Sequence, residues 1–204
     1  MNETWGIVVA GGRGDRFGGP KQFELLGGEP LWEWARRSLI DGGVHDVVIV
    51  ADFDGAAPPG DRRRDSVESG LARVPTGVDF VLVHDAARPL ATPDLVRRVI
   101  ARLEIGDVAG VVPATPIHDA TKRVDGERVV AAVTRDDLVT VQTPQGFAAA
   151  QLREAHQRIG GDAADDAEMV AEIGGAVVTV PGEVTNLKVT VPSDLRLVEA
   201  IHAG

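Results

Sequence analysis

Hydrophobic residues gather in short runs that alternate with longer stretches of helical spacing. The short apolar runs, each bounded by turn residues, predict β-strands over residues 6–10, 46–51, 80–84, 108–113 and 176–180. Apolar residues spaced three or four apart predict helices over residues 31–40, 65–74, 93–103, 147–158 and 193–202. Thr92 and Ser193 suit helix N-caps, and Pro93 suits a first helical turn. This alternation predicts an α/β fold, a doubly wound and mostly parallel sheet with helices on both faces.

Residues 115–141 break the alternation. The pair Asp125 and Gly126 stands between two short β-like runs, which predicts a hairpin turn. Because such a hairpin has little core of its own, we predict a protruding β-arm that buries its apolar side against a second copy of the chain. The alternative is an arm folded back on its own domain. At 204 residues, the chain fits one domain spanning 1–204, with 115–141 as a dimerisation arm of a homodimer.

Composition excludes several classes of function. A net charge of -10 argues against nucleic acid as a partner, since phosphate backbones are bound by a surplus of Lys and Arg. No apolar run reaches the ~18 residues that cross a bilayer, and the first residues lack a secretory signal, so we expect a cytoplasmic protein without a membrane partner. The absence of cysteine excludes disulfides and thiolate zinc sites. Because the whole chain is acidic, an anionic substrate would need a local basic pocket.

The strongest local signal is the segment AGGRGDRFGGPKQF, residues 10–23, directly after the first predicted strand. Successive glycines let backbone N–H groups converge on an anion, and ligands of doubly wound sheets bind at the carboxyl ends of the strands. A phosphate-binding loop is the natural interpretation. It is not a dinucleotide fingerprint, because Phe17 stands where the third glycine is required. It is not a Walker loop either, because Lys21 is followed by Gln22.

The G-x-G-x-R sequence followed by PKQ resembles the signature loop of the 2-C-methyl-D-erythritol 4-phosphate cytidylyltransferase family. Further motifs of that family follow in the expected order: GDRRRDSVESGL at 60–71, VHDAARP at 83–89, TPQGF at 143–147 and NLKVTVPSDL at 186–195. The resemblance spans nearly the whole chain. It implies a Rossmann-like nucleotidyltransferase fold and the transfer of CMP from CTP to methylerythritol phosphate, a sugar-alcohol phosphate. The products would be CDP-methylerythritol and pyrophosphate, in the synthesis of isoprenoid precursors.

The resemblance also implies roles for individual residues. The catalytic residues would be Arg16, Lys21, Arg135 and Lys188, with Arg135 supplied by the partner's arm. The nucleotide would be bound by Ala10, Gly11, Gly12, Gly14, Gly60, Asp61 and Ser66. The acceptor would be bound by Asp85, Arg88 and Thr143. For Ser66 the alternative is an ordinary helix-start residue, and for Asp85 it is a structural ion pair with Arg88. Mg²⁺ is the implied cofactor, since it bridges triphosphate oxygens, but the sequence does not identify its ligands.

Some positions depart from the family pattern. The loop between Gly18 and Pro20 is short, Ala120 stands where the family carries a threonine, and Arg64 adds a charge to the predicted base-binding segment. These departures leave two alternatives open: a ribitol-5-phosphate cytidylyltransferase-like enzyme, or a catalytically weak paralogue that binds nucleotide. The histidines lack metal-ligand spacing, so we expect structural or surface roles for His84, His118 and His156.

Overall fold

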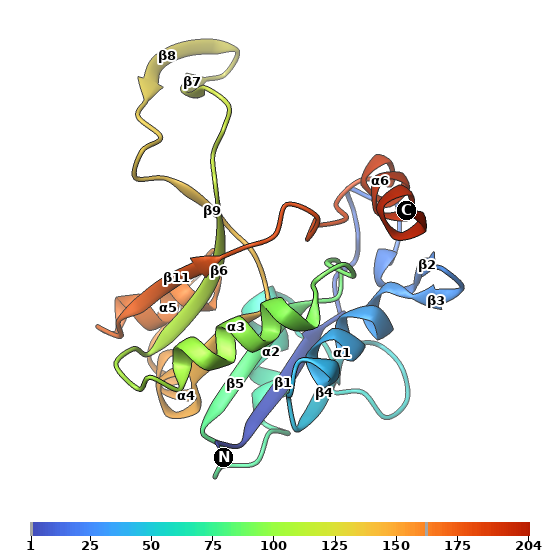
Figure 1. Ribbon diagram of the computed structural model, residues 1–204, viewed down its shortest axis with the longest axis vertical. Coiled ribbons are helices and arrows are strands. Elements are labelled where there is room, and N and C mark those ends of the chain that lie inside the picture. The colour runs from blue at the N-terminus through green and yellow to red at the C-terminus, as the bar shows by residue number, and fades with distance from the viewer. Residues whose placement is uncertain (1, 162) are drawn as a thin grey trace.

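A central seven-stranded sheet organises the protein, seen in a computed structural model that describes residues 2–161 and 163–204 (Figure 1). The strand order is β11-β6-β10-β5-β1-β4, and β9 pairs with β6 beyond this path. The strands are β1 (Thr4–Val9), β4 (Asp46–Val50), β5 (Phe80–Asp85), β6 (Gly110–Pro116), β9 (Val139–Val141), β10 (Gln145–Ala148) and β11 (Val177–Pro181). Strand β1 pairs in parallel with both β4 and β5, and β11 pairs in parallel with β6. The mostly parallel α/β sheet predicted from the sequence is confirmed.

Strand β10 is the main departure from the predicted elements. It runs antiparallel between β5 and β6, with Phe147 opposite Val81 on one side and Gly110 on the other. The helix expected over residues 147–158 therefore begins only at Ala149. The sequence prediction was wrong here because residues 147 and 148, which it assigned to the helix, belong to the strand that joins β5 to β6.

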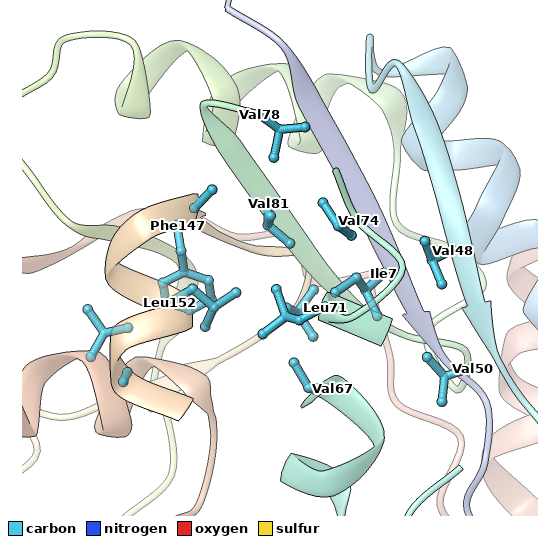
Figure 2. Packing of buried hydrophobic residues seen from close by; sticks show 14 of the residues in the cluster. Ile7, Val48, Val50, Val67, Leu71, Val74, Val78, Val81, Phe147 and Leu152 are labelled. Carbon is cyan, nitrogen blue, oxygen red and sulfur yellow. The ribbon is translucent and has the colours of Figure 1, made fainter. Parts of the chain in front are cut away.

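Helices cover both faces of the sheet, as predicted. On one face, α1 (Leu31–Asp41) and α3 (Pro93–Leu103) pack against β1 and β5 (Figure 1). On the other face lie α2 (Arg63–Leu71), α4 (Ala149–Arg158) and α5 (Asp166–Glu172), a short helix that the sequence analysis missed. Figure 2 shows the second core, in which Ile7 and Val81 of the sheet meet Leu71 of α2 and Leu152 of α4. The two cores hold the strand ends in fixed positions.

The helix ends test the predicted caps. The hydroxyl of Thr92 accepts a hydrogen bond from the backbone N–H of Leu95 at 3.1 Å, so this N-cap is confirmed. The cap expected at Ser193 is wrong, because α6 (Pro192–Ala203) already includes this residue. Instead, the Asp194 carboxylate accepts from the backbone N–H groups of Thr190 and Val191. Helix α6 packs onto a small third core beside the hairpin of β2 (Leu25–Leu26) and β3 (Glu29–Pro30).

The predicted arm is a hairpin that projects from the body of the domain (Figure 1). Strands β7 (Thr121–Asp125) and β8 (Arg128–Val133) pair antiparallel, and Gly126 in the turn has a φ of 56°. The arm is shorter than the predicted 115–141, since residues at both of its ends belong to β6 and β9 of the main sheet. In the part of the chain that the structure describes, no helix has the length and apolar character needed to cross a bilayer.

Candidate active site

A cleft of about 580 Å³ opens at the carboxyl ends of β1 and β5. Strand β1 lies between β4 and β5, so the chain leaves it toward one side and returns on the other, and ligands of doubly wound sheets bind at such a switch point. Val9 and Asp85, the last residues of the two strands, are register partners and both line the cleft. The cleft gathers most of the predicted site residues: Ala10, Gly11, Gly12, Gly14, Arg16, Lys21, Gly60, Asp61, Ser66, Asp85 and Lys188.

The glycine-rich loop forms one wall of this cleft. The carbonyl oxygen of Gly14 accepts from the backbone N–H groups of Phe17, Gly18 and Gly19 at 2.8, 2.9 and 3.3 Å, which closes the loop into a tight turn. Gly14 has a φ of 70°, and a Cβ there would lie 1.7 Å from the carbonyl oxygen of Gly19. A residue other than glycine would open this turn. The turn leads into a 3-10 segment that begins at Lys21 and so places its side chain in the cleft.

Positive charge is concentrated in the cleft although the whole chain is acidic. Burial lowers the pKa of Lys21, and the nearby charges of Lys188 and Arg16 lower it further. Cations that repel each other in this way gain stability when an anion enters between them. The cleft is therefore suited to a polyanionic ligand such as a nucleoside triphosphate.

The loop before α2 forms the opposite wall. The backbone N–H of Gly60 donates to Oγ of Ser66 at 3.1 Å, and this hydroxyl donates to the carbonyl oxygen of Arg62 at 3.3 Å. Ser66 thus lies in the first turn of α2, as its alternative interpretation proposed, and lines the cleft as well. Arg64 does not line the cleft and donates to the carbonyl oxygens of His156, in the last turn of α4, and of Gly161, beyond the end of that helix. The charge that Arg64 adds to this segment therefore lies outside the cleft.

Asp85 is the buried acid at the floor of the cleft. Its Oδ2 accepts from Nζ of Lys188 at 2.6 Å, and its Oδ1 accepts from Nε of Arg63 at 3.2 Å. Burial alone raises the pKa of Asp85, but Arg63 and Lys188 outweigh burial and hold this pKa well below its usual range. Arg88 instead donates to the carbonyl oxygens of Asn186 and Val141, which holds the loop that carries Lys188. The structural Asp85–Arg88 ion pair considered from the sequence is wrong.

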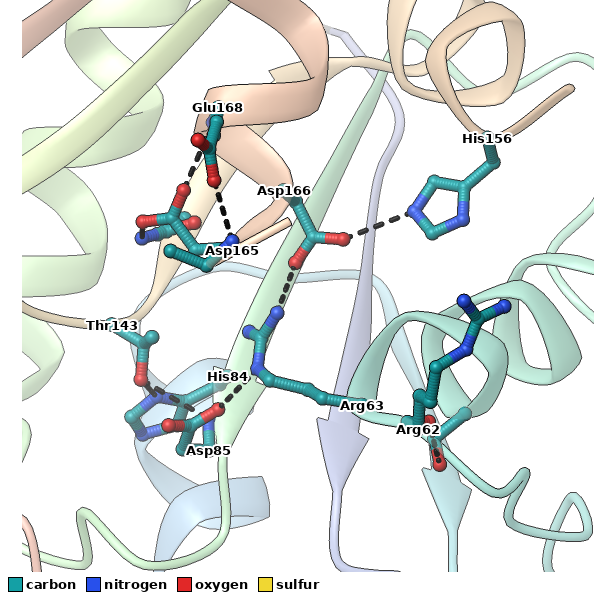
Figure 3. Close-up of polar contacts among 12 residues, drawn as sticks. Arg62, Arg63, His84, Asp85, Thr143, His156, Asp165, Asp166 and Glu168 are labelled. Atoms are coloured by element: carbon teal, nitrogen blue, oxygen red, sulfur yellow. Dashed lines mark hydrogen bonds and ion pairs between the residues drawn. The ribbon is translucent and has the colours of Figure 1, made fainter. Parts of the chain in front are cut away.

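Thr143 lies behind Asp85 rather than on the cleft surface (Figure 3). Its Oγ1 accepts from the backbone N–H of Asp85 at 3.0 Å and lies 2.7 Å from Nδ1 of His84. Burial lowers the pKa of His84 to about 3, so this imidazole is neutral near pH 7. His84 and His156 are buried, as expected for structural residues, and His118 is exposed. Through these two contacts Thr143 holds the last residues of β5 in position, on the side away from the cleft.

Arg63 lines the cleft and Asp166 is buried next to it, and the sequence analysis assigned a role to neither residue. Nη1 of Arg63 donates to Oδ2 of Asp166 at 2.6 Å, and Oδ1 of Asp166 lies 3.0 Å from Nε2 of His156 (Figure 3). Burial by itself lowers the pKa of Arg63, but Asp85 and Asp166 raise it above its usual range. The run of arginines after Gly60 and the acidic pair at residues 165–166 were visible signals, but nothing in the sequence joined them.

Arg135 lies on the arm, outside the cleft of its own chain. It is exposed and donates to the carbonyl oxygen of His118. The structure thus assembles the predicted nucleotide and catalytic residues of the body but does not bring Arg135 to them. Within residues 2–161 and 163–204, no group of three or more His, Asp or Glu side chains could hold a metal ion. Any metal in the cleft would need further ligands from substrate or water.

Comparisons with known proteins agree with this geometry. A family model described as 2-C-methyl-D-erythritol 4-phosphate cytidylyltransferase matches residues 5–203. The chain is 40% identical to the protein of that name from Streptomyces avermitilis, over 98% of this chain and 92% of the relative. It is 39% identical to the protein of the same name from Rubrobacter xylanophilus, over 100% of this chain and 96% of the relative.

A solved structure extends the similarity to the fold. The crystal structure of 2-C-methyl-D-erythritol 4-phosphate cytidylyltransferase from Thermus thermophilus superimposes with a TM-score of 0.82 at 34% identity. The match covers 97% of this chain and 98% of that structure. The nucleotidyltransferase fold expected from the sequence motifs is confirmed.

Proposed function

Because the chain belongs to the 2-C-methyl-D-erythritol 4-phosphate cytidylyltransferase family, we propose that it transfers CMP from CTP to 2-C-methyl-D-erythritol 4-phosphate. The products are CDP-methylerythritol and pyrophosphate, and the reaction serves isoprenoid precursor biosynthesis. The observation that carries this proposal is the cleft in which Arg16, Lys21 and Lys188 meet, inside a chain that matches the family from end to end. A reaction that consumes CTP fits a cytoplasmic enzyme.

The chemistry requires charge neutralisation more than proton transfer. An oxygen of the acceptor phosphate attacks the α-phosphorus of CTP, a bond forms to that phosphorus, and the bond to the leaving pyrophosphate breaks. The nucleophile is already anionic, so no general base is needed. Lys21 and Arg16 extend from the glycine-rich loop and Lys188 from the loop before α6, and in the cleft these cations can neutralise the charge that grows on the phosphoryl oxygens.

The nucleotide base is assigned to the small residues of the two walls. Ala10 and Gly11 follow β1, and Gly60, Asp61 and Ser66 precede or begin α2. Backbone groups beside such small side chains can approach the donor and acceptor edge of cytosine closely. Gly12 and Gly14 belong to the turn that faces the triphosphate.

A divalent cation fits the floor of the cleft. Mg²⁺ is bound in proteins by one or two carboxylates together with substrate phosphates and water, and Asp85 offers a carboxylate beside the cations of the cleft. Asp85 would help to hold Mg²⁺, which when bound would withdraw negative charge from the phosphates. Asp85 would also contact the polyol of the acceptor, while Thr143 holds the end of β5 behind it and Arg88 holds the loop that carries Lys188.

The acceptor phosphate is assigned to a homodimer rather than to one chain. Val124, Val129 and Val130 on the arm are exposed, and burying them against a second copy would remove apolar surface from water. Arg135 of one protomer would then reach the cleft of its partner, where its planar guanidinium suits a phosphate. In this assembly the arm completes the acceptor site.

The direct test measures pyrophosphate release with CTP and Mg²⁺, with methylerythritol phosphate, ribitol 5-phosphate or no acceptor. We expect release that depends on methylerythritol phosphate. Release only with ribitol 5-phosphate would reassign the acceptor and give the Ala120 departure a meaning. Silence with every acceptor, despite CTP binding in calorimetry, would identify a catalytically weak nucleotide-binding paralogue.

A further inference from the structure

A chain of charged groups runs from the cleft floor into the interior between α4 and α5 (Figure 3). Arg63 donates to Asp85 through Nε at 3.2 Å and to Asp166 through Nη1 at 2.6 Å. Asp166 then meets Nε2 of His156 at 3.0 Å, and this nitrogen must donate because a carboxylate only accepts. The side chains of Asp166 and His156 are 1% and 3% exposed, so this series of charged groups ends in the buried interior of the protein.

The two cations that contact Asp85 are held differently. Lys188 reaches it through a single flexible ammonium group, and its side chain is 41% exposed. Arg63 is 28% exposed and is gripped at both edges of its guanidinium, by Asp85 in the cleft and by Asp166 behind it. Moving Arg63 would leave Asp166 as a buried carboxylate without its cation, which is strongly unfavourable. Lys188 can therefore exchange its partner at lower cost than Arg63.

This difference matters because the substrates are anions. A carboxylate left without a cation at the floor would repel an incoming phosphate. We propose that Asp166 and His156 are positioning residues that lock Arg63 against Asp85, so that Lys188 is free to leave Asp85 for the phosphates of the substrates. This inference rests on the proposed function, because it concerns how the same cleft receives its anionic substrates.

The kinetic test compares Asp166→Ala, Asp166→Asn and His156→Ala with the wild type in pyrophosphate release. In Asp166→Ala we expect kcat/KM to fall roughly 10- to 100-fold, mainly through higher KM for the anionic substrates, as for other residues that orient a functional group. Asp166→Asn should rescue most of this loss, because its amide oxygen can still accept from Arg63. His156→Ala should fall between them.

The matched control is Met169→Ala on the same helix, α5. Met169 is buried in the core and contacts neither Arg63 nor Asp166 through a hydrogen bond or ion pair. Its truncation therefore loosens α5 without releasing Arg63. We expect lower thermal stability with KM values close to wild type. An equal rise of KM in Met169→Ala and Asp166→Ala would overturn the proposal, since loosening of α5 would then explain the effect.

A second readout is independent of activity. Crystal structures of wild type and Asp166→Ala should show Arg63 displaced from Asp85 in the variant, and wild type with CTP should show Lys188 on phosphate while Arg63 stays. An unmoved Arg63 in Asp166→Ala would overturn the proposal. If that variant does not fold, wild-type KM in folded His156→Ala overturns it, and raised KM there supports it. A wild type that turns over no acceptor would refute the proposed function, whereas these crystal structures would still decide the role of Asp166.

Discussion

The cleft and the β-arm are built in opposite ways. In the cleft, Asp85 has two cations from distant parts of the chain, and the surrounding loops are fixed by hydrogen bonds and buried helices. On the arm, Val124 and Val129 are each 59% exposed, and the hairpin extends from β6 and β9 of the main sheet. One chain is therefore sufficient to shape the nucleotide side of the site. It leaves the arm without a surface to cover it.

The largest expected effect belongs to the cleft. Lys21→Ala should lower kcat/KM for pyrophosphate release about 100- to 1000-fold, the range for removing one donor that stabilises transition-state charge. Its thermal unfolding should match wild type, because the side chain lies at the cleft surface rather than in a core. Lys122→Ala, an exposed cation on the arm, is the matched control and should keep full turnover. Wild-type rates in Lys21→Ala would remove Lys21 from the mechanism.

The next effect tests whether the arm takes part in the site. Arg135→Ala should lower kcat/KM for the acceptor about 10- to 100-fold, the equivalent of one hydrogen-bonded charge contact, with a smaller change in the KM for CTP. Steady-state kinetics with each substrate varied in turn measures this split. Arg128→Ala on the same hairpin is the control, and an equal loss in both variants would show that the arm acts through its shape rather than through Arg135.

A pH titration of stability tests whether His84, which lies next to Asp85 behind the cleft, is buried in its neutral form. His84 has a folded pKa of about 3 against an ordinary value of 6.5, so protonation favours the unfolded chain. Its contribution to the free energy of unfolding is complete above pH 6.5 and is lost as the pH falls toward 3, by at most about 1.4 kcal/mol per pH unit. Urea unfolding of wild type and His84→Gln should show a difference that shrinks between about pH 7 and 5. A constant difference would contradict a neutral, buried His84.

The smallest expected effect on stability concerns the arm. Val129→Ser should change the unfolding free energy of the single chain by no more than about 0.5 kcal/mol, as for other exposed positions. It should nevertheless weaken self-association in sedimentation velocity over a range of protein concentrations. Leu197→Ser is a matched control, since Leu197 is 55% exposed on α6, far from the arm in sequence. Equal effects of the two variants on self-association would place the dimer contact elsewhere.

The sequence was sufficient for the strands with continuous apolar runs and insufficient for β10. Pro144 and Gly146 interrupt the TPQGF segment, and both residues argue against a strand when read locally. In the folded chain Gly146 is needed, because a Cβ there would lie 2.6 Å from Cγ1 of Val99 on α3. Gly146, which argues against a strand when read locally, thus allows α3 to approach the sheet closely, and no local pattern records that approach.

In the candidate site too, local sequence patterns predicted some features, whereas contacts between distant residues determined others. The motifs brought Lys21, Asp85 and Lys188 together correctly because each lies in a segment with its own signature. The contact between Arg63 and Asp166 joins residues 103 positions apart, and neither residue type indicates its partner. Thr143 was expected to contact the acceptor, and its hydroxyl is already engaged beneath the cleft. Long-range contacts and the direction of a side chain were the parts that sequence patterns could not supply.

The position of β10 has a consequence for how the protein is made. Residues 145–148 join β5 to β6, although they follow both strands in the chain. During synthesis on a ribosome, β5 and β6 therefore emerge with open edges and cannot be joined until Ala148 has left the exit tunnel. Such unpaired edges are exposed to aggregation while the chain is incomplete. Nascent chains that stop before Gln145 should bind chaperones, whereas chains that extend past α4 should become resistant to protease.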